Sequence, residues 1–334
     1  MTPRALLDES FVWDNHGCMP LRPHDADFLP QLARYKANGV NAVTLNIGFG
    51  EQGIEEHVRV IANFRRWLAE NDRDYMLATS VEDIERARRD GKLAVMFDIE
   101  GMNAVADQTS MVQLYYDLGV RWMLVAYNRN NPAGGGCQDE DQGLSAFGRQ
   151  ILDEMARVGM IACCSHTGPR TVMDVMAYSS RPVIFSHSNA RALHDHERNI
   201  ADDQIMACAA QGGVIGINGV GLFLGDGDAT DRILAHIDYM CERVGAAHVG
   251  LGLDSILFCQ PDDALSVEEL GPRATQYWPP HQYPSTPMAF APIEVIPEIV
   301  TGMKTRGYSE ADIAGILGGN FARIAATVWK PVAA

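Results

Sequence analysis

Short apolar runs rich in β-branched residues alternate along the chain with amphipathic segments of helical length. Such runs predict strands that are buried on both faces, and the segments between them predict helices that cover the strands. The expected strands are Ser10–Asp14, Val40–Ile47, Leu93–Ile99, Trp122–Tyr127, Met160–Ser165, Pro182–Ser186, Val214–Asn218 and Val249–Leu253. Eight strands separated by helices favour a closed α/β fold, a (β/α)8 barrel of the TIM type, over an open sheet.

Helical patterns with start and stop signals lie between these runs. They span Ile54–Glu70, Val81–Asp90, Leu144–Val158, Thr171–Ser179, Asp202–Gln211 and Ala229–Val244. Ser80 stands before an acid-rich first turn, as helix N-termini prefer, and Gly159 and Gly245 stand where two helices are expected to end. A ninth apolar run, Tyr75–Thr79, is interpreted as a short extra segment before the third strand.

One long segment, residues 259–292, is rich in proline and aromatic residues. Loops of that length are usually functional lids or interface arms. Trp278 and Tyr283 in it are predicted either to line a pocket or to form a dimer contact, and we expect a homodimer. The helices Ile293–Arg306 and Glu310–Val328 are expected to close the barrel at the end of the chain.

Length and charge narrow the class of protein. The 334 residues suit one barrel with insertions, so a single domain is expected over residues 1–334. The net charge of −16, with scattered Lys and Arg, argues against nucleic acid as a partner, because phosphate binding needs a basic face. The sequence shows no signal peptide and no apolar stretch of membrane-spanning length, and its seven cysteines are expected to be reduced thiols. These features predict a cytoplasmic protein that binds no membrane.

Side chains that can bind metal ions follow several of the expected strands. They are His16, Cys18, Glu100, His166, His187 and Asp254. In a (β/α)8 barrel the catalytic groups lie at the C-terminal ends of the strands, so these side chains are expected at one rim. A single histidine at a strand end is more often a satisfied polar residue, but imidazoles and carboxylates from distant parts of the chain together favour a zinc site.

Several motifs resemble the membrane (renal-type) dipeptidase family of metal-dependent amidohydrolases. The segment Pro182–Leu193 resembles the family signature, and Arg198–Asp203 resembles the Arg-Asn-x-x-Asp-Asp stretch that follows it. Ile99–Gly101 resembles the motif with the metal-bridging glutamate, and Ser165–His166 resembles the motif with the first histidine of the middle pair. Gly250–Asp254 resembles the strand that carries the catalytic aspartate. The resemblance covers nearly the whole chain, with its motifs in the expected order.

The resemblance implies a zinc-dependent hydrolase that cleaves the amide bond of a dipeptide or an N-acyl amino acid with a free carboxylate. His166, His187 and Glu100 would hold one zinc ion, and His16 with the same glutamate would hold a second. Asp254 would act as the general base, taking a proton from the attacking water and passing it to the leaving amine.

The resemblance also implies residues that bind the small-molecule substrate. Arg198 would bind the substrate carboxylate through its planar guanidinium group, whereas a solvated loop charge is the alternative for this residue. Arg191 is the reserve candidate for the carboxylate. Tyr127 stands where the animal enzymes of the family have a substrate-binding histidine, and Tyr127 and Asn128 would contact the substrate.

Besides Tyr127, two positions depart from the family pattern. The family's His-x-Asp motif is His16-Gly17-Cys18 in this chain, so Cys18 replaces its aspartate. Cys163 likewise stands where the family has an aspartate. A thiolate can bind zinc but is softer and bulkier than a carboxylate. Cys18 is therefore either a ligand or a plain buried thiol, and we expect one well-occupied zinc site and a weak or absent second site.

Two other classes of function remain as alternatives. One is a barrel lyase or decarboxylase that uses a single metal ion, and the other is a small-molecule binding protein whose metal site is impaired by Cys18. The presence of Glu100, Arg198 and Asp254 argues against the binding protein, because a binder needs no proton-transfer group. A carboxylate-binding arginine beside a bridging glutamate favours amide hydrolysis over the lyase.

Overall fold

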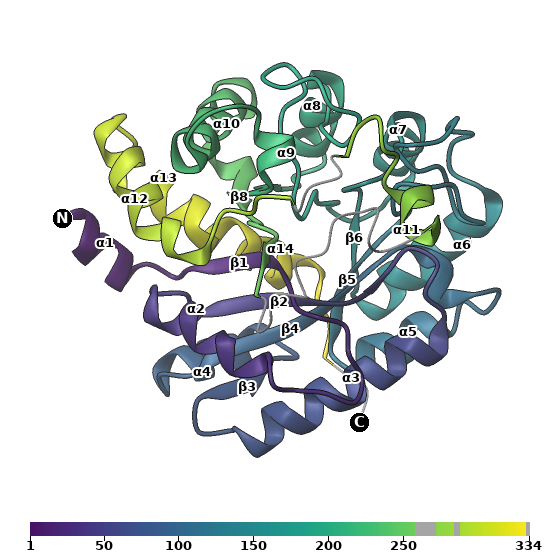
Figure 1. Cartoon of the computed structure of the whole chain (residues 1–334), viewed down its shortest axis with the longest axis horizontal. Helices are drawn as coiled ribbons and strands as arrows, with labels where there is room; N and C mark the ends of the chain where they lie inside the picture. The colour runs from purple at the N-terminus through teal and green to yellow at the C-terminus, as the bar shows by residue number, and fades with distance from the viewer. Residues whose placement is uncertain (258–271, 284–287, 332–334) are drawn as a thin grey trace.

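The computed structural model describes residues 1–257, 272–283 and 288–331, and its elements are arranged around a ring of parallel strands (Figure 1). The strands of the ring are β1 (Trp13–Cys18), β2 (Ala42–Phe49), β4 (Leu93–Glu100), β5 (Val120–Leu124), β6 (Ile161–Cys163), β7 (Ile215–Ile217) and β8 (Val249–Leu251). They pair in the order β6-β5-β4-β2-β1-β8-β7. No helix within the described ranges is both long and apolar enough to cross a membrane.

Ile184 and Phe185 close the ring between β6 and β7. Ile184 pairs with Cys163 of β6 and Phe185 pairs with Ile215 of β7, both in parallel orientation. The Ile184 amide donates to Ala162 O at 3.0 Å, and the Phe185 amide donates at the same distance to the carbonyl of Val214, the residue directly before β7. The predicted strand Pro182–Ser186 is thus reduced to two bridging residues. With these residues as the eighth position, the predicted (β/α)8 barrel is confirmed.

The first strand lies further along the chain than its apolar pattern predicts. Helix α1 (Pro3–Glu9) ends at Ser10, and β1 begins only at Trp13. Asp14 and His16 are polar, which is more typical of a loop than of a buried strand, yet both are fully buried in β1. The expected range Ser10–Asp14 is therefore wrong, because this strand carries polar groups into the barrel instead of an apolar run.

Two short strands supplement the ring. The extra segment expected at Tyr75–Thr79 is β3 (Tyr75–Leu77), which pairs with the first residues of β4. A second one, β9 (Ser255–Ile256), follows β8 and pairs with the end of β1. The β1–β9 pairing holds the segment after β8 close to Cys18, so the end of β1 and the start of this segment lie side by side.

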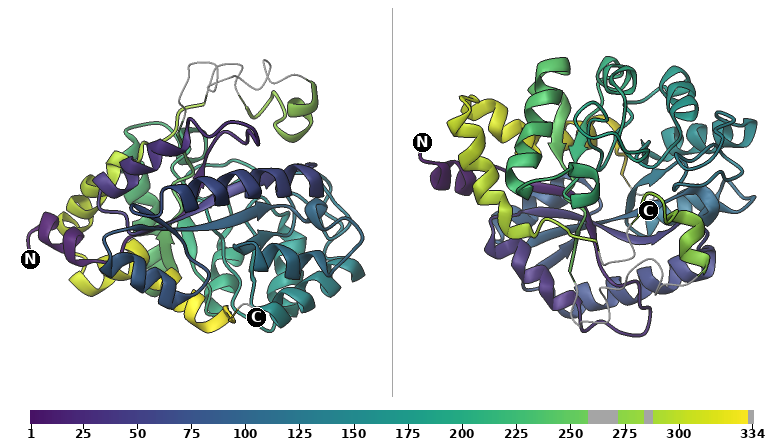
Figure 2. Two further views of the ribbon diagram at one scale, coloured as in Figure 1. Left: turned by 90° about the horizontal axis from the view of Figure 1, so that it is seen from below. Right: turned by 45° about the horizontal axis from the view of Figure 1, so that its top comes forward.

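Helices cover the outside of the ring (Figures 1 and 2). They are α2 (Ala33–Ala37), α3 (Ile54–Glu70), α4 (Val81–Arg89), α5 (Met111–Asp117), α6 (Ala146–Val158), α7 (Pro169–Tyr178), α8 (Asp202–Ala210), α9 (Gly221–Leu224) and α10 (Ala229–Val244). Ser80 caps α4 by accepting from the Asp83 amide, and α6 ends at Gly159 with a left-handed φ of 94°. These boundaries confirm the predicted caps.

The end of the chain closes the barrel but not as two continuous helices. After α12 (Ile296–Thr305), the expected helix Glu310–Val328 is divided into α13 (Glu310–Ala314), a π-helical turn (Gly315–Gly319) and α14 (Asn320–Val328). The break lies at Gly318, where a Cβ atom would stand 2.7 Å from backbone atoms of Phe11 and Trp13. The close approach of β1 to this turn therefore needs a glycine.

The Pro- and aromatic-rich segment contains more regular structure than expected. Residues 258–271 and 284–287 lie outside the described residues. The expected loop over 259–292 can therefore be compared with the structure only at residues 272–283 and 288–292. The described part contains the helix α11 (Pro272–Tyr277). Figure 2 shows α11 over one end of the barrel. Asn128 Nδ2 donates to Tyr277 O at 2.9 Å, which places α11 at the end where the strands terminate.

Candidate metal and substrate site

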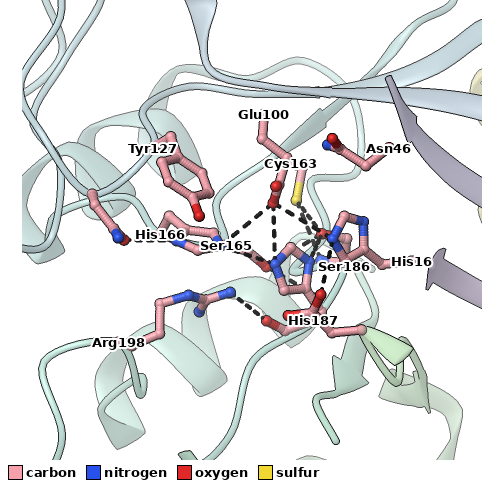
Figure 3. A network of polar contacts seen from close by, with 12 residues as sticks. His16, Asn46, Glu100, Tyr127, Cys163, Ser165, His166, Ser186, His187 and Arg198 are labelled. Carbon is pink, nitrogen blue, oxygen red and sulfur yellow. Dashed lines mark hydrogen bonds and ion pairs between the residues drawn. The ribbon is translucent and has the colours of Figure 1, made fainter. Parts of the chain in front are cut away.

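The side chains predicted from the strand ends meet at one rim of the barrel, and four of them, His16, Glu100, His166 and His187, are labelled in Figure 3. His16 and Cys18 belong to β1, and Glu100 is the last residue of β4. His166 lies three residues after β6, and His187 follows the Ile184–Phe185 bridge. Parallel strands end at the same side of a barrel, which is why residues so far apart in sequence converge.

The Glu100 carboxylate lies among three imidazoles. Its Oε1 atom is 3.2 Å from His187 Nε2, 3.4 Å from His166 Nε2 and 3.7 Å from His16 Nε2. The same Oε1 atom is buried and has no hydrogen-bond partner among the described residues. His16, Glu100 and His187 offer ligand atoms within 4.8 Å of one another. A buried carboxylate oxygen without a donor indicates that a cation completes this cluster.

Each imidazole is oriented through its other nitrogen. His166 Nδ1 lies 2.7 Å from Asn128 Oδ1, and His187 Nδ1 lies 2.7 Å from Ser186 Oγ. His16 Nδ1 lies 3.1 Å from the carboxylate of Asp98. An Nδ1–H that donates to these oxygens leaves the Nε2 lone pair free, and the three Nε2 atoms then face Glu100 as metal ligands do. His166 Nε2 and His187 Nε2 are only 3.0 Å apart, so both face the same point.

Burial disfavours the charged forms of the Glu100 carboxylate and of the imidazoles around it. It raises the pKa of Glu100 to about 8 and holds the pKa values of His166 and His187 well below the ordinary value. For His16 burial is the largest single influence and lowers the pKa, but Asp98, Cys18 and Glu100 together outweigh it and raise the pKa well above the ordinary value. A divalent cation at this point would reverse the effect on Glu100, because it favours the carboxylate and neutral imidazoles.

A second group of possible ligands adjoins the first. Cys18 Sγ donates to Asp254 Oδ1 at 3.1 Å and lies 3.5 Å from His16 Nε2. Asp254 Oδ1 is itself 3.5 Å from His16 Nε2. Burial and the negative charge of Asp254 raise the pKa of the Cys18 thiol, so without a cation it stays protonated. His16 thus belongs to both candidate groups.

Backbone strain is concentrated at this rim. Four non-glycine residues among those described have a positive φ: Ala106, Asn128, His166 and Asp254. Three of the four belong to the site, with φ values of 55°, 61° and 56° for Asn128, His166 and Asp254. A left-handed backbone costs a non-glycine residue free energy and persists only where the surroundings enforce it. Of these three, His166 and Asp254 were predicted from the strand ends, and Asn128 was predicted from the family resemblance.

Arg198 is buried beside the histidines. Only 2% of it is exposed, so the alternative of a solvated loop charge is wrong. Its Nη1 donates to Ser188 Oγ at 3.1 Å and its Nη2 donates to His187 O at 2.7 Å. Figure 3 shows Arg198 and Tyr127 on the side of His166. The reserve candidate Arg191 is partly exposed and bonds to Glu197, so it has another partner.

The two other residues expected to bind substrate have different surroundings. Tyr127 stacks on His166 with ring centroids 4.2 Å apart, and its Oη accepts from Trp278 Nε1 at 3.2 Å. Because the Trp278 N–H can only donate, the proton of the Tyr127 hydroxyl is available to another acceptor. Both polar atoms of the Asn128 side chain have partners within the protein: Oδ1 contacts His166 Nδ1, and Nδ2 donates to Tyr277 O. We therefore propose that Asn128 orients His166 and that Tyr127 contacts the substrate.

The sequence reasoning missed several residues that support the site. Asp98 Oδ2 contacts His16, and its other carboxylate oxygen accepts from Asn46 Nδ2 at 2.9 Å. Asp98 precedes Glu100 by two residues on β4, so the two-residue period of a strand places both side chains on the inner face. This two-residue period could have predicted Asp98 as a neighbour of the site. Ser186, next to His187, carried no comparable signal.

Comparison with known proteins decides the family. The sequence profile of the membrane dipeptidase family (Peptidase family M19) matches residues 5–261. The chain belongs to the membrane dipeptidase family. The resemblance predicted from the motifs around His187, Glu100 and Asp254 is therefore confirmed.

Two of the curated proteins that the chain resembles are fungal dipeptidases. An uncharacterized dipeptidase of Schizosaccharomyces pombe is 35% identical over 200 residues, which are 57% of this chain and 48% of that protein. Dipeptidase tcpJ of Claviceps purpurea is 29% identical over 255 residues, which are 74% of this chain and 54% of that protein. The matches thus span about half the length of these curated relatives.

Solved structures match over almost the full chain. An amidohydrolase from Pseudomonas aeruginosa has a TM-score of 0.88 and 25% identity, and the match covers 98% of this chain and 99% of that one. A metallo peptidase from Rhodobacter sphaeroides, liganded with a phosphinate mimic of the dipeptide L-Ala-D-Ala, has a TM-score of 0.77. Its identity is 18%, over 96% of this chain and 100% of that chain, so this second likeness shows the fold alone.

Replacement of Cys18 by aspartate tests the second metal site. A carboxylate at this position adds a hard anionic ligand beside His16 and Asp254, so bound zinc is expected to rise from about one ion per chain to about two. The measurement is metal analysis after dialysis, with Cys18→Ala as the control that removes the thiol without adding a ligand. Two tightly held zinc ions in the unaltered protein would contradict this expectation and make Cys18 a ligand itself.

Proposed function

We propose that this protein is a zinc-dependent dipeptidase that hydrolyses the amide bond of a dipeptide or a related amide with a free carboxylate. The observation that carries the proposal is the unpartnered Glu100 Oε1 atom within 3.2–3.7 Å of three imidazole nitrogens. Family membership supports it, because the chain matches the membrane dipeptidase profile over most of its length.

The donor set fits a divalent ion such as zinc. Imidazole nitrogens and carboxylate oxygens are zinc ligands, and each imidazole has the second hydrogen bond that usually fixes a ligating histidine. His166, His187 and Glu100 would hold the well-occupied ion, and His16, Cys18 and Asp254 would form the weaker group. A bound ion of this kind supplies Lewis acidity, which lowers the pKa of water and polarises a carbonyl.

Asp254 is proposed to move the proton. Asn218 Nδ2 donates to its Oδ2 at 3.1 Å, and Cys18 Sγ donates to its Oδ1. These two contacts fix the carboxylate beside His16, where it would be able to accept a proton from a water at the metal site. Asp254 would accept the proton of that water and give it to the leaving amine, so that the two products leave as an acid and an amine.

Arg198 and Tyr127 are proposed to position the substrate. The guanidinium group of Arg198, fixed by Ser188 and His187, presents a planar set of donors that suits a carboxylate. The free hydroxyl proton of Tyr127 would donate to the carbonyl oxygen of the scissile amide, because Trp278 already occupies an acceptor site of its oxygen. A dipeptide held by its carboxylate and by the carbonyl oxygen of its amide would place that amide next to Glu100.

Replacement of Arg198 by lysine tests this substrate class. Lysine keeps the charge but loses the planar pair of donors, so kcat/KM for L-Ala-D-Ala is expected to fall about 10- to 100-fold, mainly through KM. The control is Arg191→Lys, because Arg191 bonds to Glu197 instead. Hydrolysis is measured with the dipeptide and with its C-terminal amide. An Arg198→Lys protein that hydrolyses both compounds as the parent does would refute the assignment of Arg198.

A further inference from the structure

Four aromatic side chains gather beside the metal cluster. Between ring centroids, Phe49 lies 5.2 Å from Tyr127 and 5.7 Å from Trp278. The ring of Tyr127 lies 5.9 Å from that of Tyr277. These residues come from the end of β2, from the segment after β5, and from the end of α11 with the residue that follows it. We call Phe49, Tyr127, Tyr277 and Trp278 the aromatic group.

The aromatic group adjoins the metal cluster at two points. Phe49 is the last residue of β2 and pairs with Glu100 in the ladder between β2 and β4. Tyr127 stacks on His166 with ring centroids 4.2 Å apart. A substrate whose amide lies at the metal cluster would therefore have these rings within reach of one of its two residues.

The aromatic group offers a largely apolar surface. Phe49, Tyr277 and Trp278 are partly exposed, and all three pack against the same core cluster. The indole N–H of Trp278 already donates to Tyr127 Oη at 3.2 Å, so this side chain presents the carbon atoms of its ring to a ligand. Aromatic rings that are held in place bury a large apolar area with few rotatable bonds. Such a wall suits an apolar side chain better than a charged one.

The position of Tyr127 indicates which part of the substrate meets the aromatic group. Under the proposed function its hydroxyl donates to the carbonyl oxygen of the scissile amide, and that carbonyl belongs to the acyl residue, the N-terminal one of a dipeptide. Figure 3 shows the hydroxyl at the end of the ring that faces Glu100, and Trp278 Nε1 contacts the same oxygen. The acyl residue would thus lie next to Trp278 and Phe49, whereas Arg198 would hold the other end of the substrate.

We infer that the aromatic group binds the side chain of the acyl residue and that the protein prefers substrates in which this side chain is large and apolar. The inference rests on the proposed dipeptidase function and deepens it by naming the class of acyl residue. A phenylalanine side chain buries apolar area that alanine lacks, which is expected to raise kcat/KM about 10- to 100-fold. An acidic acyl side chain would lose hydration against the negative faces of the rings.

The experiment compares dipeptides that differ only in the acyl residue. With the zinc-loaded parent, kcat/KM is measured for L-Phe-D-Ala, L-Leu-D-Ala, L-Ala-D-Ala and L-Glu-D-Ala, and the first two are expected to exceed the others about tenfold or more. Phe49→Ala is expected to lower the ratio of kcat/KM for L-Phe-D-Ala to that for L-Ala-D-Ala about tenfold. Phe147→Ala, the same change at a partly exposed residue of α6, is the matched control and is expected to keep the ratio of the parent.

A second readout measures affinity without turnover. Zinc-loaded Asp254→Asn protein is titrated calorimetrically with L-Phe-D-Ala and L-Ala-D-Ala, and addition of Phe49→Ala is expected to weaken binding of the first compound more than that of the second. Zinc content and far-ultraviolet circular dichroism of each variant establish that a changed ratio does not arise from lost metal or an unfolded barrel. The panel with the parent tests the inference even if Phe49→Ala does not fold.

The outcomes separate this inference from the proposed function. A parent that hydrolyses all four dipeptides with similar kcat/KM overturns the inference, while the dipeptidase proposal stands. A preference for L-Phe-D-Ala that folded Phe49→Ala protein retains in full also overturns it. If none of the four dipeptides is hydrolysed, the proposed function fails and the inference fails with it.

Discussion

Replacement of Glu100 by glutamine is expected to reduce bound zinc strongly and to lower kcat/KM for L-Ala-D-Ala by about 10³-fold or more. Glu100 Oε1 is the atom that His166, His187 and His16 share, at 3.4, 3.2 and 3.7 Å. Glutamine has nearly the same shape, but it removes the negative charge that offsets a divalent ion. The measurement combines metal analysis with steady-state kinetics.

The control for this variant is Glu242→Gln, which alters an exposed glutamate on α10. It makes the same chemical change away from the site, and both zinc content and kinetics are expected to match the parent. A Glu100→Gln protein that keeps its zinc and its activity would show that the carboxylate is a structural residue. The buried oxygen without a hydrogen bond would then lack an explanation.

Replacement of Asp254 by asparagine is expected to lower kcat about 10²- to 10⁴-fold with a much smaller change in KM. Asparagine keeps the shape of the side chain but cannot accept the proton of the attacking water. Zinc held by His166, His187 and Glu100 is expected to remain, because Asp254 belongs to the other group with His16 and Cys18.

The readouts are kcat, KM and zinc content, with the exposed Asp226→Asn as the matched control. A loss of activity that accompanies complete loss of zinc would assign Asp254 a role as metal ligand rather than as base. An unchanged kcat would exclude both roles. Retained zinc with a low kcat is the result that supports proton transfer.

The fold was largely predictable because the ring of strands is built from apolar runs. The boundaries of α3 and α10 agree with their helical patterns, and the order of strand ends predicted which residues meet. The pattern failed at β1, where Asp14 and His16 are buried in the barrel. A functional strand carries polar groups inward, so hydrophobicity alone locates it poorly.

The part of the site that is specific to this chain was less predictable. Asp98 is implied by the two-residue period that also places Glu100, whereas the hydrogen bond of Trp278 to Tyr127 joins residues 151 positions apart. Such a contact depends on how the segment around α11 crosses the barrel end, and no local pattern encodes that path. The same holds for Phe49 and Trp278, whose ring centroids lie 5.7 Å apart.

Removal and return of the metal tests the central claim most directly. Purified protein is treated with a chelator, its zinc content is measured, and hydrolysis of a dipeptide panel that includes L-Ala-D-Ala is followed as zinc is titrated back. Activity is expected to disappear with the metal and to return in proportion to bound zinc, reaching its maximum when the site formed by Glu100, His166 and His187 is filled. Full activity in the metal-free protein, or a zinc-loaded protein that hydrolyses no dipeptide of the panel, would contradict the proposed function.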